Sequence, residues 1–210
     1  MKPKQIIERS SAMIEVIVLD VATRAATSGE VKWACKGLGP LRVVLLKETA
    51  GLRILPIWVG PDEGDIIAMQ LEHIETHRPT TFDLTTRLLA FGNTKLEKVA
   101  VTALRENTYF ATMWINANGK AHEVDARPSD AITLALQADA PIFIAPETLI
   151  GNKSLITADN ELMQLNEQWA KLEKEGHTDP EPQPMEWKSV RSLARNALLE
   201  SKAGLKRVTH

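Results

Sequence analysis

The stretch that most constrains this chain is 123–136, where a predicted strand runs directly into a predicted helix. Pro128 suits the first turn of that helix, because its ring fixes φ and its missing N–H has no intrahelical partner there. Asp130 then falls at the third helical position, where a carboxylate interacts favourably with the positive end of the helix dipole. Small and apolar residues follow at helical spacing, which predicts a buried face with Asp130 at its edge. A charge in that place needs a partner or a chemical role.

Strand and helix signals alternate along the rest of the chain, which predicts an α+β fold. Apolar runs predict strands over residues 13–21, 41–47, 52–59, 96–104, 109–115, 121–124 and 141–145. Helices are predicted to begin at residues 61, 81 and 128, and the first of them to end at 77–79. The polar segments 48–51 and 105–108 predict hairpin turns, and glycines and a proline in 27–40 predict a loop.

A change of pattern after about residue 150 divides the chain into three predicted parts. Residues 1–12 are predicted to be a flexible leader, 13–151 the main domain, and 152–210 a helical C-terminal extension with a proline-rich linker at 176–186. Residues 188–210 carry six basic side chains and one acidic one. This charge run fits either a solvated helix or a surface that contacts a phosphate backbone or a protein partner.

Charge and cysteine content exclude several classes of protein. A net charge of −2 gives no overall attraction to nucleic acid or to an anionic membrane. Cys35 is the single cysteine, which excludes an internal disulfide framework and a cysteine-based zinc site. No apolar run reaches the roughly 20 residues of a membrane span, and residues 1–12 lack the apolar segment of a signal peptide. We therefore expect a soluble, cytoplasmic protein without membrane association.

The side chains that could carry chemistry are acids at the starts of predicted elements. No phosphate-loop, dinucleotide-binding, zinc-protease or serine-hydrolase motif is present. His73 and His77 are four residues apart near a helix end, which favours a solvated or C-capping role. The remaining set is Glu63, Asp83, Asp125 and Asp130, accompanied by Arg78 and Arg127. As chemistry, such acids suit Mg²⁺ or Mn²⁺ and a guanidinium suits phosphate. As structure, they cap helices and pair at a joint.

Taken in order, these residues resemble the bifunctional nuclease domain family. The resemblance covers about residues 13–151 and is carried by Leu55-Pro-Ile-Trp-Val-Gly60 with Glu63, by Arg78-Pro79 with Asp83-Leu84, and by Asp125-Ala-Arg-Pro-Ser-Asp-Ala-Ile132. It implies a mixed, largely antiparallel sheet with helices packed on it, a homo-oligomer, and RNase or DNase activity. Two positions depart from the family pattern. Phe82 replaces a histidine that could act as base or ligand, and Gly64 stands where alanine is common.

The resemblance and the acids together lead to the first hypothesis, a metal-assisted nuclease that hydrolyses RNA or DNA. Its catalytic residues are Glu63, Asp83, Asp125 and Asp130, its Mg²⁺ or Mn²⁺ ligands Glu63, Asp125 and Asp130, and its phosphate-binding residues Arg78 and Arg127. The alternative is a non-catalytic binding or scaffold module, in which these residues are structural and the basic C-terminal helix contacts a partner. A third hypothesis is an anion pocket between two helix N-termini. The first hypothesis requires the four acids to face one cleft.

Overall fold

The computed structural model describes residues 13–26, 42–106, 108–149, 155–157, 167 and 185–191, without the side chains of 24–26, 157 and 185–188. Its strands are β1 (Ile14–Ala26), β2 (Arg42–Glu48), β3 (Arg53–Val59), β4 (Thr94–Arg105), β5 (Thr108–Ala117), β6 (Lys120–Ala126), β7 (Ile142–Ile144), β8 (Ile156–Thr157) and β9 (Met185–Ser189). Its helices are α1 (Pro61–Leu71), α2 (Thr81–Phe91), α3 (Pro128–Ala138) and the single turn α4 (Pro146–Leu149).

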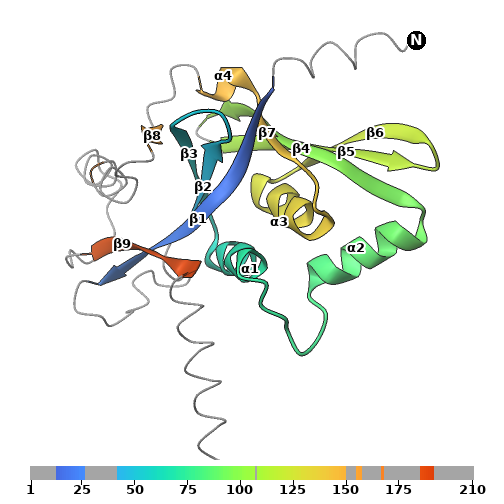
Figure 1. Ribbon diagram of the computed structural model, residues 1–210, viewed down its shortest axis with the longest axis horizontal. Coiled ribbons are helices and arrows are strands. Elements are labelled where there is room, and N and C mark those ends of the chain that lie inside the picture. The colour runs from blue at the N-terminus through green and yellow to red at the C-terminus, as the bar shows by residue number, and fades with distance from the viewer. Residues whose placement is uncertain are drawn as a thin grey trace, which may run out of the picture.

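The described strands form one nine-stranded sheet (Figure 1). Its order is β6-β5-β4-β7-β1-β2-β3-β8, and β9 pairs with the far end of β1. The β4–β7 pair is parallel and the other described pairs are antiparallel. The α3 helix supplies the crossover that a parallel pair requires, because it lies in the chain between β6 and β7. The predicted α+β fold with a mixed, largely antiparallel sheet is confirmed.

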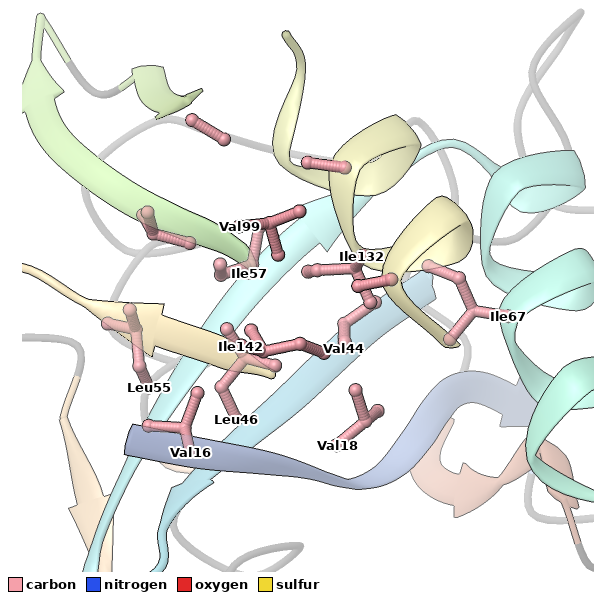
Figure 2. Packing of buried hydrophobic residues seen from close by; sticks show 14 of the residues in the cluster. Val16, Val18, Val44, Leu46, Leu55, Ile57, Ile67, Val99, Ile132 and Ile142 are labelled. Carbon is pink, nitrogen blue, oxygen red and sulfur yellow. The ribbon is translucent and has the colours of Figure 1, made fainter. Parts of the chain in front are cut away.

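The main core lies between the sheet and helices α1 and α3 (Figure 2). Apolar side chains from both layers meet there, including Val16, Val44, Leu46, Leu55, Ile57, Ile67, Val99, Ile132 and Ile142. Burial of each large aliphatic side chain contributes roughly 1.5–3 kcal/mol. The β2–β3 hairpin is buried on both faces, because Val43, Leu45 and Ile54 belong to a second cluster. Burial on both faces accounts for the unbroken apolar runs of these strands in the sequence.

Helices α1 and α3 lie side by side and run in the same direction. Their third residues, Glu63 and Asp130, both accept hydrogen bonds from Arg127. Gln70 and Gln137, each seven residues further on, line the same hollow. Residues seven apart lie on nearly the same face of a helix, separated by about 10 Å along its axis. We call this contact the α1–α3 seam; it has an N-terminal end at Arg127 and a C-terminal end at the two glutamines.

Gly64 makes room for a buried arginine. A Cβ on Gly64 would lie 2.4 Å from the Cβ of Arg42, so α1 can approach β2 closely only without a side chain there. The Arg42 guanidinium donates to Asp65 Oδ1 at 2.7 Å and Oδ2 at 3.2 Å, and to Thr23 Oγ1 at 2.6 Å. The space that an alanine side chain would occupy at position 64 is therefore filled by the Arg42 side chain.

Two stretches differ from the sequence prediction. Helix α1 ends at Leu71 instead of at 77–79, and the chain turns at His73, which has a φ of 51°. Met185–Ser189 forms β9, although its first two residues fall in the predicted linker 176–186. The leader 1–12, the loop 27–40 and most of the extension 152–210 lie outside the described residues. Within the described ranges, no helix has the length and apolar character needed to cross a membrane.

Candidate functional site

At the N-terminal end of the seam, one arginine joins two of the predicted site acids. Arg127 Nε and Nη2 donate to the two carboxylate oxygens of Asp130, at 2.7 Å and 3.0 Å. Arg127 Nη1 donates to Glu63 Oε1 at 3.0 Å. The hydrogen bonds and charge of Asp130 raise the pKa of Arg127, and Glu63 adds to the effect. We call Glu63, Arg127 and Asp130 the arginine cluster.

Local sequence explains how the arginine cluster forms. Each acid is the third residue of a helix that begins with proline, so each carboxylate sits at a positive helix end. Gly60 leaves space for Glu63, because a Cβ at Gly60 would lie 2.2 Å from Glu63 Oε2. The Arg127 side chain is 66% exposed. An ion pair this exposed is screened by water and contributes about 1 kcal/mol or less.

The arginine cluster does not suit an anion or a free phosphate ligand. Its two carboxylates already occupy the helix N-termini at which the third hypothesis places an anion. Three N–H groups of the Arg127 guanidinium donate to those carboxylates, so its charge is already paired within the fold. The positive charge of Arg127 is therefore paired with two negative charges of the same chain, those of Glu63 and Asp130.

Asp125 lies on the other side of the sheet, although it is five residues before Asp130. In β6 it pairs with Thr112, whereas Val124 pairs with Met113. Met113 packs against the main core on the helix side. Because neighbouring side chains of a strand point to opposite faces, Asp125 points away from the helices. The register therefore separates Asp125 from Glu63 and Asp130.

Asp83 is held at the start of its own helix. The Thr80 N–H and Oγ1 donate to Asp83 Oδ2 at 2.6 Å and 2.7 Å, and the Asp83 N–H donates to Thr80 Oγ1 at 3.2 Å, which makes a capping box. Gln137 Nε2 donates to Asp83 Oδ1 at 2.7 Å and ties α2 to α3. The hydrogen bonds from Thr80, more than the other contacts, lower the pKa of Asp83. Asp83 is therefore an ionised carboxylate with both oxygens in use.

A cleft opens at the C-terminal end of the seam. It has a volume of about 530 Å³ and lies between the end of α1, the turn that follows, and the start of α2. An adjoining hollow of about 540 Å³ shares part of its lining and continues to Gln137 on α3. The polar groups of the cleft wall include Gln70, His73, His77, Thr80, Asp83 and Arg87. Asp83 is the predicted site acid that borders this cleft.

The cleft brings together residue types that suit phosphate chemistry. Arg87 makes no ion pair with any residue that the structure describes, although its charge helps to lower the pKa of Asp83. A guanidinium binds phosphate oxygens, and an imidazole moves protons near neutral pH. His73 occupies the left-handed region, which is uncommon for a residue with a side chain and often marks a turn or a functional position.

The sequence prediction missed part of this cleft. It assigned His73 and His77 to capping or solvent, and it did not single out Arg87. The signals that could have found them are the four-residue spacing of the histidines and the position of Arg87 one helical turn after Asp83. Arg78 is an exposed residue between His77 and Pro79, which both line the cleft. Phe82, in place of the family histidine, packs against the main core.

The predicted metal ligands are not brought together. Among the described residues, no three His, Cys, Asp or Glu side chains are grouped so that they could hold one ion. Glu63 and Asp130 are near each other, but the guanidinium of Arg127 lies between them. Magnesium sites can consist of one or two carboxylates completed by water and substrate phosphate. An ion bound in that way would depend on the substrate for its remaining ligands.

Sheet, seam and cleft define an α+β domain with a polar, histidine-lined cleft where three helices meet. The family model described as bifunctional nuclease domain matches residues 44–156, which is more than half of the chain. The chain belongs to that family.

The chain is also similar to three individual proteins. Two uncharacterised proteins of Mycobacterium tuberculosis, from strains CDC 1551 / Oshkosh and ATCC 25618 / H37Rv, are each 37% identical over 117 residues, which is 56% of this chain and 69% of the relative. Bifunctional nuclease 1 of Arabidopsis thaliana is 28% identical over 108 residues, which is 50% of this chain and 33% of that protein.

Proposed function

We propose that this protein is a nuclease that hydrolyses phosphodiester bonds of RNA, DNA or both, with the cleft as its active site. The observation that carries the proposal is the cleft wall, which His73, His77 and Arg87 line together with the fixed carboxylate of Asp83. Membership of the bifunctional nuclease domain family supports the choice of reaction. The acids of the arginine cluster take a structural role in this proposal, because Arg127 occupies both of them.

The groups of the cleft match the requirements of phosphodiester hydrolysis. Arg87, with Arg78 at the rim, would bind the non-bridging phosphate oxygens. One imidazole would accept the proton of the attacking water as its oxygen bonds to phosphorus. The other would donate a proton to the leaving oxygen as its bond to phosphorus breaks. Asp83 would hold α2 in place and not attack, because both of its oxygens accept hydrogen bonds.

We also propose that cleavage requires a divalent ion, Mg²⁺ or Mn²⁺. The proton transfers described above involve only side chains of the chain. When bound to the substrate phosphate, such an ion would neutralise charge on the scissile group. The described acids do not form a ligand cage for it. Cleavage in EDTA, compared with cleavage in added Mg²⁺ or Mn²⁺, measures the requirement directly.

The test of the proposal is cleavage of labelled single-stranded RNA and DNA by the full chain. We expect Arg87→Ala to lose about tenfold to a hundredfold in kcat/KM, because a charge-assisted hydrogen bond contributes about 1.5–3 kcal/mol. Asp125→Asn should cut like wild type, because Asp125 lies on the opposite face of the sheet. If folded wild-type protein cuts neither strand under any of the three ion conditions, the nuclease proposal is wrong.

A binding or scaffold module is the second candidate function. It is favoured by the structural use of Asp83 and Arg127 and by the packing of Phe82 in place of a histidine. In this case the cleft binds a phosphate-containing partner without turnover. Salt-sensitive binding of a labelled strand that stays intact, and that weakens in Arg87→Ala, would support this candidate over the enzyme.

We also propose that copies of the chain associate through the outer face of α2. Leu84, Leu88 and Phe91 lie along this face and are 54%, 60% and 89% exposed. No residue of α2 is buried, which is unusual for a helix with this much apolar surface. The molar mass in solution should be a multiple of the chain mass and should fall in Leu88→Ser with Phe91→Ser. An unchanged mass in that variant, or a monomeric wild type, contradicts the proposal.

A further inference from the structure

A short segment beyond the family match contacts the end of α1, close in sequence to residues that line the cleft. Residues 185–191 follow the matched range 44–156 by nearly thirty positions. Their first part, β9, continues the sheet along the end of β1 (Figure 1). Val190 comes next and is 7% exposed within the main core. Arg191 then reaches α1. We call residues 185–191 the strap.

Arg191 links β1 to the end of α1. Its Nε donates to Glu72 Oε1 at 2.8 Å, and its Nη1 donates to the carbonyl oxygen of Leu19 at 2.8 Å. Leu19 is the extra residue of a β-bulge, since the register with β2 shifts between Val18 and Asp20. A bulge leaves the extra residue outside the regular ladder, so its carbonyl is available to the guanidinium.

The ion pair supplies a charge that α1 lacks. The helix begins with Asp62 and Glu63, but its last turn contains no basic residue. A cation near a helix C-terminus interacts favourably with the helix dipole, and Glu72 is the C-cap residue. Arg191 lies 119 positions further along the chain. The Glu72 side chain is 9% exposed, so the carboxylate is largely removed from water and depends on its partners.

The next residue after Glu72 is His73, which lines the cleft in a left-handed conformation. Gln70, which lines the cleft too, precedes Glu72 by two positions. A contact that fixes Glu72 therefore also restrains the backbone that carries Gln70 and His73. Arg191 is not among the residues that line the cleft, so we expect it to act on the cleft through Glu72.

We infer that Arg191 is a positioning residue for the cleft, and that the strap fixes the end of α1 so that His73 faces the cleft. Only the cleavage readout of this inference rests on the proposed nuclease function. Without Arg191, the last turn of α1 loses its hydrogen-bonded connection to the Leu19 carbonyl of β1, and the turn at His73 opens more easily. A positioning error of this kind lowers the rate of the chemical step more than it weakens substrate binding.

The experiment compares Arg191→Ala and Arg191→Lys with a matched control, Arg53→Ala, in the full chain. Arg53 also pairs with a largely buried glutamate, Glu48, but at the end of the β2–β3 hairpin that points away from α1. A double variant, Arg191→Ala with Glu72→Gln, removes the Glu72 charge together with the Arg191 guanidinium that pairs with it. The readouts are amide hydrogen exchange over residues 70–74, the thermal midpoint, and kcat and KM for strand cleavage.

We expect Arg191→Ala to speed exchange over 70–74 by about tenfold or more, because local opening becomes easier, and to lower kcat more than it raises KM. Arg53→Ala should leave both readouts unchanged. Arg191→Lys should keep part of the slow exchange and part of the wild-type kcat, because lysine can pair with Glu72 but lacks the guanidinium fork. The double variant should regain part of the thermal stability, since no largely buried carboxylate is left without its guanidinium partner, while exchange stays fast and kcat stays low.

Two results would overturn the inference. One is unchanged exchange over 70–74 in Arg191→Ala, and the other is a double variant that recovers slow exchange and kcat together with its stability. If wild-type protein cleaves no strand, the nuclease proposal fails and hydrogen exchange alone decides the inference. Faster exchange in Arg191→Ala but not in Arg53→Ala then still supports the strap as the element that fixes the cleft wall.

Discussion

The two ends of the α1–α3 seam each contain an arginine near an acid, but the hydrogen bonds that these side chains make differ between the ends. At the N-terminal end, Arg127 uses its donors on Asp130 and Glu63. At the C-terminal end, Asp83 lies one helical turn from Arg87, yet its oxygens accept hydrogen bonds from Thr80 and Gln137 instead. One end is a closed ion-pair cluster, and the other is a cleft with a guanidinium and two imidazoles in its wall.

The difference shows that an acid near an arginine in the sequence does not identify a functional site. What distinguishes the two ends is whether the hydrogen-bonding capacity of the side chains is already used within the fold. Within the described residues, Arg127 donates three hydrogen bonds to the two acids, whereas Arg87 makes no ion pair. The predictions below separate these two ends experimentally.

The largest effect is expected for His73→Gly at the cleft end. Glycine accepts the φ of 51° without strain, so the free energy of unfolding should stay the same or rise by up to about 1 kcal/mol. Strand cleavage should fall by about a hundredfold or more, because a general acid or base is removed. The measurements are kcat/KM for strand cleavage and the free energy of unfolding from urea titration. Full activity in this variant would show that His73 takes no part in catalysis.

A smaller effect, on stability and its pH dependence, is expected for Thr80→Ala. The capping hydroxyl is lost, which should cost about 1 kcal/mol near neutral pH. Asp83 has a folded-state pKa below its unfolded value, so its stabilisation is present above the unfolded pKa and is lost as the pH falls through the folded pKa. The difference between Thr80→Ala and wild type in urea unfolding should therefore be smaller at about pH 3 than near neutral pH. A difference that stays constant or grows in acid contradicts this account of Asp83.

The smallest effect is expected for Gly60→Ala at the N-terminal end. Gly60 has a φ of −63° and a ψ of 160°, which alanine adopts readily. The new methyl group would displace the Glu63 carboxylate from Arg127, while the bidentate pair with Asp130 remains. We expect the free energy of unfolding to change by less than about 1 kcal/mol, because this pair is exposed. A larger loss of stability in thermal unfolding would mean that Glu63 stabilises the fold through contacts other than its ion pair with Arg127.

The sequence predicted most of the sheet and the helix starts, because those depend on local signals. Alternation and apolar runs located β2 to β7, and proline at the first turn located α1 and α3. The sequence also contains the signal for the capping contacts of Asp83, since Thr80 and Asp83 have the spacing of a capping box. The end of α1 was missed, because the turn at His73 contains neither glycine nor proline.

The remaining features depend on contacts between distant residues, which local patterns do not contain. Strand β9 pairs with β1 across about 160 positions of sequence, so its five residues carry no local signal strong enough to identify them. Asp125 and Asp130 are near in sequence, but the alternation of β6 puts Asp125 on the far face. The partner of Arg127 on α1 likewise follows from the packing of two helices and not from spacing.

The most direct test of the account measures strand cleavage in Arg87→Ala and Arg127→Ala on the same labelled substrate. Both variants remove one exposed arginine beside an acid at one end of the same seam. The account predicts a loss of about tenfold or more for Arg87→Ala and a change of less than about twofold for Arg127→Ala. A large loss in Arg127→Ala with full activity in Arg87→Ala would place the active site at the arginine cluster and contradict the account.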